Sequence, residues 1–172
     1  TLFSATLPSA IRRLADRYLR DPQQVTIQRE QVTVAAIEQR YYLVNESDKT
    51  AALTRLFEME EIGSALIFVR TRAGTGELAV ELTKRGFPSE AINGDLAQEA
   101  RERTLNRFRK GQIKVLVATD VAARGLDIEN ISHVFNYDLP DEAAEVYVHR
   151  IGRTGRAGKT GIAISLVTPR EK

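Results

Sequence analysis

The chain contains no cysteine and no tryptophan, and its only histidines are His133 and His149. Without cysteine it can form no disulfide, thiolate nucleophile, iron–sulfur cluster or cysteine-ligated zinc site. Two histidines are too few for a histidine-rich metal site, so we predict that this chain binds no metal itself. The lack of cysteine is compatible with a reducing compartment, and we expect a cytoplasmic protein.

Long apolar runs and a strong excess of one charge are also missing. No stretch approaches the ~18 to 20 apolar residues that a membrane-spanning helix needs. Lysine and arginine total 25 against 23 acidic residues, which gives a formal charge of only +2, so any basic surface must come from local clustering. With 172 residues, 42% of them hydrophobic, the chain is long enough to bury a stable core.

Apolar runs alternate with amphipathic stretches along most of the sequence. We predict strands at 37–44, 65–69, 89–92, 114–118, 132–136 and 161–168, and helices at 8–20, 48–59, 75–85, 98–110 and 142–149. Uninterrupted apolar strands between helices are typical of parallel sheets that are buried on both faces. The sequence therefore predicts an α/β fold with a mainly parallel sheet covered by helices on both faces. Residues 23–36 show little helical period, and we interpret them as a short strand and a connector.

Three of the predicted strands are followed by small polar or basic residues. These segments are Arg70-Thr71-Arg72, Asn93-Gly94-Asp95 and Thr119-Asp120. In parallel α/β sheets, the loops after the carboxyl ends of the strands lie at one edge and commonly bind ligands. Hydroxyls, glycines and arginines in such loops can approach phosphates. Each loop alone is ordinary turn chemistry, but the three together indicate a phosphate-binding edge.

The most unusual segment is residues 149–161, in which basic residues and glycines each recur at every third position. Four glycines make a poor helix, and an anion relieves the repulsion between the guanidinium groups. We therefore predict an anion site, with a solvated basic loop as the alternative. The Gly-Lys-Thr at 158–160 resembles the end of a P-loop, but Arg153 stands where its first glycine is required. The arginines are expected to act on a phosphate that another domain holds.

Residues 118–128 place four polar or charged side chains in one passage from a strand to a loop. Within it, Asp120 and Arg124 could form a salt bridge, and Asp127 could be a turn acid.

These segments occur in the order and spacing of the motifs of DEAD-box RNA helicases. Ser4-Ala5-Thr6 resembles motif III, residues 69–72 motif IV, Gln98 with Arg101 motif IVa, residues 118–127 motif V and residues 149–158 motif VI. Over nearly its whole length the chain is similar to the C-terminal RecA-like domain of that family, a three-layer domain. The resemblance implies that 1–29 is the tail of an N-terminal RecA-like domain, 30–36 a linker and 37–172 the C-terminal domain.

The resemblance also implies a reaction and a set of site residues. ATP would lie between two RecA-like domains, with Mg²⁺ held by the absent N-terminal domain, and RNA would lie across both domains. Arg153 and Arg156 would be catalytic arginine fingers at the γ-phosphate, with Gly125 and Asp127 also at the nucleotide. Residues implied to contact or support the RNA backbone are Thr71, Arg72, Gly94, Gln98, Arg101, Thr119 and Arg124. Residues implied to link the two sites across the domain interface are Ser4, Thr6, Asp120, His149 and Arg150.

One position departs from the family pattern. The family commonly has histidine where this chain has Asn93, which can donate a hydrogen bond but cannot carry charge. Aromatic residues make up only 6% of the chain, so we expect RNA binding through the backbone rather than through base stacking. We expect the chain alone to bind RNA weakly and to hydrolyse essentially no ATP. A stand-alone nucleic-acid-binding module and a two-domain DNA motor are the alternatives.

Overall fold

The computed structural model describes residues 9–20, 23, 37–124, 126, 128, 131–141, 144–155 and 160–171. The chain divides into two compact units, Thr1–Gln31 and Val32–Lys172. The first unit contains helix α1 (Ser9–Tyr18), which lies within the helix predicted at 8–20. Apart from residue 23, the strand and connector predicted at 23–36 lie outside the described residues.

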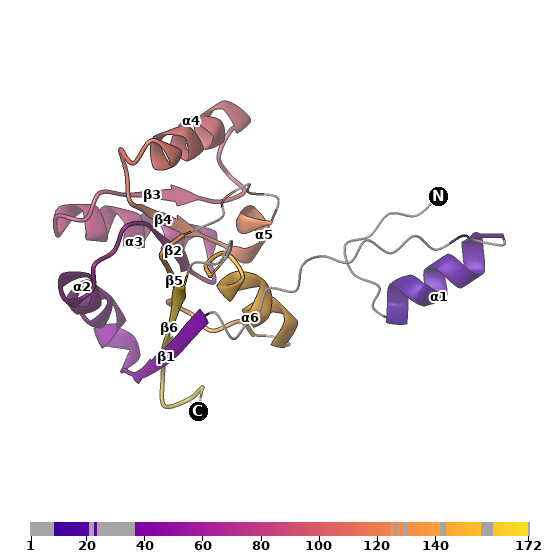
Figure 1. Cartoon of the computed structure of the whole chain (residues 1–172), viewed down its shortest axis with the longest axis horizontal. Helices are drawn as coiled ribbons and strands as arrows, with labels where there is room; N and C mark the ends of the chain where they lie inside the picture. Colours follow the sequence, from indigo (N-terminus) through magenta and orange to yellow (C-terminus); the bar gives the residue numbers. More distant parts are fainter. Residues whose placement is uncertain are drawn as a thin grey trace. The chain divides into compact units, whose positions relative to one another are not determined.

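The second unit is built on one sheet of six parallel strands (Figure 1), in the order β1-β6-β5-β2-β4-β3. The strands are β1 (Ile37–Leu43), β2 (Ala65–Phe68), β3 (Ser89–Ile92), β4 (Val115–Ala118), β5 (His133–Asn136) and β6 (Gly161–Val167). All six predicted strands are present, with ends that differ by no more than one residue. The predicted α/β class with a parallel sheet is therefore confirmed.

Helices cover both faces of this sheet. They are α2 (Lys49–Met59), α3 (Arg72–Lys84), α4 (Gln98–Arg109), α5 (Asp120–Ala123) and α6 (Ala144–Ile151), and a 3-10 turn at Glu46–Asp48 precedes α2. Helix α3 begins three residues before the predicted start because the Thr71 side chain accepts a hydrogen bond from the Gly74 N–H and caps the helix. The one-turn helix α5 was not predicted. No helix among the described residues is long and apolar enough to cross a bilayer.

Apolar clusters on both faces hold the helices against the sheet. On one face, Leu53 and Phe57 of α2 and Leu82 of α3 pack on β2, β4 and β5. The ring of Phe57 meets that of Phe135 edge to face, with centroids 5.1 Å apart. On the other face, Leu105 of α4 and the residues around α5 pack on the alternate side chains of the same strands. Burying each such side chain stabilises the fold by about 1.5–3 kcal/mol, so the central strands form a firm base for the loops that follow them.

Candidate functional site

The carboxyl ends of the strands gather the three predicted loops. Because all six strands are parallel, these ends lie at one edge of the sheet, and β2, β4 and β3 are direct neighbours there. The segments 70–72, 119–120 and 93–95 follow these strands in turn. The prediction that the three loops share one edge is confirmed.

Side-chain contacts join the loop after β2 to the loop after β3. Arg72 Nη1 lies 2.5 Å from Asp95 Oδ1. The amide of Asn93 donates to the Arg72 carbonyl at 3.3 Å and to Thr75 Oγ1 at 2.9 Å, and its own oxygen accepts the Asp95 N–H at 3.0 Å. The nitrogen of the Asn93 amide therefore joins the two loops, and its oxygen shapes the loop after β3, both without a charge.

The two threonines predicted to contact RNA are helix caps. Thr71 is exposed, and its hydroxyl accepts the Gly74 N–H at 3.0 Å at the start of α3. Thr119 is buried, and its hydroxyl accepts the Ala122 N–H at 3.4 Å at the start of α5. Both side chains therefore shape the loops, and only Thr71 is exposed to solvent.

The other predicted RNA-side residues lie along the same edge. Gln98 opens α4 and donates to Glu102 at 2.8 Å, and Gly94 is exposed in the neighbouring loop. Arg101 is half-buried, and its Nη2 donates to the Ala122 carbonyl at 2.7 Å, so it ties α4 to α5. Arg124 is exposed at the end of α5. The edge thus presents a row of polar and basic groups from β3 to β4.

Arg150, on α6, lies inside the domain and is only 3% exposed. Its Nε and Nη2 donate to the two carboxylate oxygens of Asp120, both at 2.7 Å. Its Nη1 donates to Asn136 Oδ1 at 3.1 Å and to the Asp138 carbonyl at 2.6 Å. The guanidinium carbon lies 4.9 Å from the centre of the Phe68 ring. Arg150 therefore ties α6 to α5 and to the ends of β2 and β5.

The alternative salt bridge between Asp120 and Arg124 is wrong for the described part of the chain. Arg124 leaves α5 with an extended backbone, φ −65° and ψ 131°, and is exposed. Only its backbone N–H reaches Asp120, at the carbonyl, over 3.0 Å. The Asp120 carboxylate instead pairs with Arg150, which comes from α6.

Residues 149–161, which we call the arginine segment, begin within α6, and Arg153 reaches from there to the loop after α5. Arg153 is half-buried, and its Nη1 donates to the Leu126 carbonyl at 3.0 Å. His149 is exposed on α6. The remaining predicted site residues, which lie outside the described residues, are Ser4, Thr6, Gly125, Asp127 and Arg156.

The Gly-Lys-Thr tripeptide at 158–160 is not a P-loop. A P-loop opens a helix, whereas Gly161 directly after Thr160 opens strand β6. The described edge therefore offers guanidinium groups that suit a phosphate, and Gly161 leads into a strand and not into a phosphate-cradling helix.

The structure also reveals a buried ion pair that sequence reasoning missed. Lys49 is 1% exposed, and its Nζ lies 2.9 Å from Asp138 Oδ1 and 3.1 Å from Glu46 Oε2. Burial disfavours the charge, but the hydrogen bonds and negative charges of the two acids outweigh it and raise the pKa of Lys49 above its ordinary value. Lys49 lies four residues before the core residue Leu53 and therefore on the apolar face of α2. This position is the sequence feature that could have indicated that Lys49 is buried.

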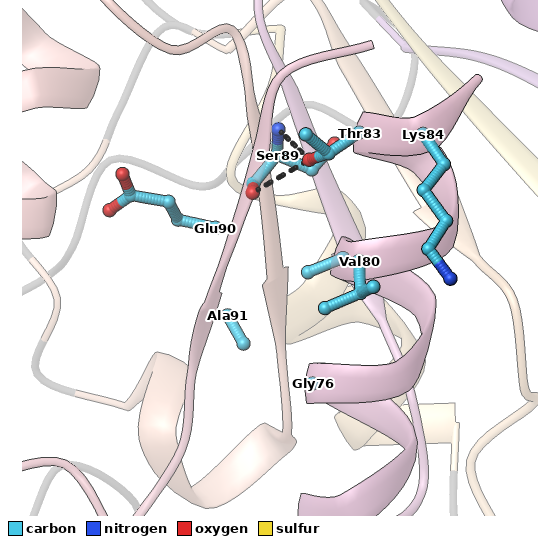
Figure 2. A pocket seen from close by; sticks show the side chains of 8 residues that line it. Gly76, Val80, Thr83, Lys84, Ser89, Glu90 and Ala91 are labelled. Carbon is cyan, nitrogen blue, oxygen red and sulfur yellow. Dashed lines mark hydrogen bonds between the residues drawn. The ribbon is translucent and has the colours of Figure 1, made fainter. Parts of the chain in front are cut away.

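A groove of about 400 Å³ lies beside β3 and α3, away from these loops (Figure 2). A hydrogen bond joins α3 to β3 there, because Thr83 Oγ1 accepts the Ser89 N–H at 3.1 Å. The groove runs along β3 and stops short of the loop at Asn93, so it is separate from the strand-end site. Its lining residues are mostly small or apolar: Gly76, Ala79, Val80, Thr83, Lys84, Ser89, Glu90 and Ala91.

Comparison with known proteins agrees with this geometry. Residues 48–158 match the family model of the helicase conserved C-terminal domain. The chain is 51% identical over 170 residues to the DEAD-box ATP-dependent RNA helicase CshA of Geobacillus kaustophilus, covering 99% of the chain and 36% of that protein. It thus spans about a third of the length of the curated relatives that it matches.

The solved structures that are similar to this chain include members of the same family. S. cerevisiae Dbp5 bound to RNA and ADP BeF3 matches with a TM-score of 0.81 and 41% identity, over 98% of this chain and 45% of that one. The E. coli DEAD-box protein SrmB, bound to regulator of ribonuclease activity A, matches with a TM-score of 0.74 and 44% identity, over 78% of this chain and 79% of that one. The chain therefore belongs to the helicase conserved C-terminal domain family, as the C-terminal RecA-like domain of a DEAD-box RNA helicase.

Proposed function

We propose that this chain is one half of the ATP- and RNA-binding machinery of an ATP-dependent RNA helicase. It binds part of the RNA backbone and supplies arginines to ATP that an N-terminal RecA-like domain holds. The observation that carries the proposal is the combination of phosphate-suited loops at the carboxyl edge of the sheet with an arginine segment after α6, where Gly161 opens a strand instead of a phosphate-cradling helix. The match to Dbp5, whose structure contains RNA and ADP BeF3, supports the same reading.

The RNA side of the proposed site is the row of loops that follow β3, β4 and β2. Thr71, Arg72, Gly94, Gln98 and Arg124 are exposed there and can approach sugar and phosphate groups. Arg101 and Thr119 are more buried and hold α4 and α5 in place. Contacts with the sugar-phosphate backbone carry no base sequence, so the chain binds RNA irrespective of sequence.

The nucleotide side of the proposed site is the arginine segment after α6. Arg153 and Arg156 approach the γ-phosphate as arginine fingers, and Gly125 and Asp127 contribute to binding the nucleotide. ATP, with Mg²⁺ held by the N-terminal domain, supplies the phosphoryl group that is transferred to water. Guanidinium groups stabilise the negative charge of the transition state, and such fingers contribute about 10³- to 10⁵-fold in related phosphoryl-transfer enzymes.

The remaining residues connect the two domains in this proposal. Ser4, Thr6 and His149 act across the interface when the domains close. Asp120 and Arg150 support them from within the C-terminal domain, because their bidentate ion pair fixes the end of α6 against α5.

The proposal is tested by comparing the 172-residue chain with a two-domain protein in which it follows an N-terminal RecA-like domain. The chain alone should bind RNA weakly and hydrolyse no ATP, and the two-domain protein should hydrolyse ATP when RNA is added. ATP turnover by the purified chain would refute the proposal. Tight, nucleotide-independent RNA binding with a steep salt dependence would support a stand-alone binding module instead. Stronger stimulation by DNA than by RNA would indicate a DNA motor.

A further inference from the structure

The buried pair of Lys49 and Asp138 lies where the ends of β2 and β5 meet α2. The Lys49 side chain is 1% exposed and that of Asp138 is 12% exposed, and 89 residues separate them in the sequence. Desolvating two such ions cancels much of their attraction, so a well-packed apolar pair could serve stability as well. The presence of this ion pair is better explained by the neighbouring segments that its hydrogen bonds hold in place.

Asp138 uses every polar group it has. One carboxylate oxygen accepts Lys49 Nζ at 2.9 Å, and the other accepts the Arg70 backbone N–H at 2.9 Å. Its carbonyl accepts Arg150 Nη1 at 2.6 Å, and its N–H donates to the Phe68 carbonyl at 3.2 Å. A single residue thus contacts the segment that leads from β2 into Thr71 and Arg72, and also the arginine at the end of α6.

We infer that Lys49 and Asp138 are positioning residues that hold the RNA-side segment after β2 and the arginine-bearing end of α6 in one fixed arrangement. The inference rests on the proposed function for the roles of those two segments. Lys49 acts by fixing the carboxylate: with one oxygen bound to the ammonium, the other is directed at the Arg70 N–H. Without Lys49, the carboxylate loses its buried partner and its orientation.

The kinetic test uses the two-domain protein with Lys49→Met or Asp138→Asn, at a temperature at which each variant is fully folded. Both variants should raise the KM for RNA and lower kcat together, with kcat/KM reduced about 10- to 100-fold, because misplacing binding and reacting groups by about 1 Å has effects of that size. Lys49→Arg, which keeps the cation, should recover part of this loss. If the folded Lys49→Met and Asp138→Asn proteins keep wild-type KM and kcat, the pair is only structural and the inference is wrong.

Arg40→Met is the matched control. It breaks the half-buried pair in which Arg40 Nη1 lies 2.6 Å from Glu60 Oε1, beyond the other end of α2. This variant should lose stability but keep both kinetic constants. If Arg40→Met changed KM and kcat as Lys49→Met does, loss of stability alone would explain the kinetics and the inference would fail.

A second measurement needs no catalysis. Hydrogen exchange at the Arg70 amide of the 172-residue chain should be slow in the wild type and faster in Lys49→Met, with no change in Arg40→Met. If breaking the pair prevents folding, the double variant Lys49→Met/Asp138→Asn removes both buried charges and should fold while still exchanging quickly at Arg70. If the Arg70 amide exchanges at the wild-type rate in either folded variant, the inference is wrong, whether or not the two-domain protein shows RNA-stimulated ATP turnover. If the wild-type two-domain protein shows no RNA-stimulated ATP turnover, the proposed function is refuted. The exchange rate at Arg70 then decides by itself whether Lys49 and Asp138 position the segment after β2.

Discussion

Replacing Gly161 with alanine tests how closely β6 approaches the arginine segment. A Cβ at this position would lie closer than 3.0 Å to the side chain of Thr154 and to the backbone nitrogen of Gly155. Thr154 is fully buried, and its hydroxyl donates to the Ile131 carbonyl with the Ser132 carbonyl 3.2 Å away, so it has no free space into which to move. Overpacking of this kind costs about 1–3 kcal/mol, and a lost hydrogen bond adds about 1 kcal/mol. We expect Gly161→Ala to lower the free energy of unfolding by about 2–4 kcal/mol.

Urea unfolding of the 172-residue chain measures this effect, and Gly76→Ala is its control. A Cβ on Gly76, inside α3, would meet no atom within 4 Å, so this variant should gain about 0.5–1 kcal/mol from helix propensity. In the two-domain protein, Gly161→Ala should also slow ATP turnover, because Thr154 directly follows Arg153. A stability within about 0.5 kcal/mol of the wild type, the ordinary range for surface substitutions, would refute the close approach of β6 to the arginine segment.

Three further predictions concern single side chains. Asp120→Asn should cost about 3 kcal/mol in urea unfolding, because it leaves the buried Arg150 guanidinium without its counter-ion; a loss under about 1 kcal/mol would contradict this. Asn93→Ala should raise the KM for RNA several-fold with little change in kcat, since it frees the two RNA-side loops; an unchanged KM would show that the amide does not position them. Burial lowers the pKa of His133 below its ordinary value of 6.5 and outweighs the nearby Glu60, so the unfolded chain takes up the proton first as the pH falls. The free energy of unfolding should therefore decrease below about pH 6.5 in the wild type, and His133→Gln should lack this decrease; equal pH profiles would contradict it.

The sheet was predictable because its strands are short apolar runs separated by helices. Residues 65–68 and 115–118 are buried on both faces, as uninterrupted apolar sequence indicates. The same pattern places the loops at the carboxyl edge, and the strand character of 161–168 excludes a P-loop. These features depend on local sequence, so sequence alone was sufficient for them.

The parts that were missed depend on contacts between distant segments. Helix α5 is one turn of four residues, shorter than any window in which a helical period can be recognised. The spacing of Asp120 and Arg124 suggested a local salt bridge, but α5 ends at Arg124 and the carboxylate instead pairs with Arg150 from α6. Nothing near Lys49 in the sequence indicates Asp138, because the two meet only when α2 packs beside β5.

The most direct test of the central claim is RNA-stimulated ATP turnover by the two-domain protein with Arg153→Ala or Arg156→Ala, measured together with ATP affinity. Arg55→Ala, which removes an exposed arginine paired with Glu58 on α2, is the control, and thermal unfolding confirms that each variant is folded. We predict that turnover falls by about 10³-fold or more in the first two variants while ATP binding survives and Arg55→Ala is unaffected. Unchanged turnover in folded Arg153→Ala and Arg156→Ala proteins would contradict the claim that this chain supplies the arginines that act on ATP.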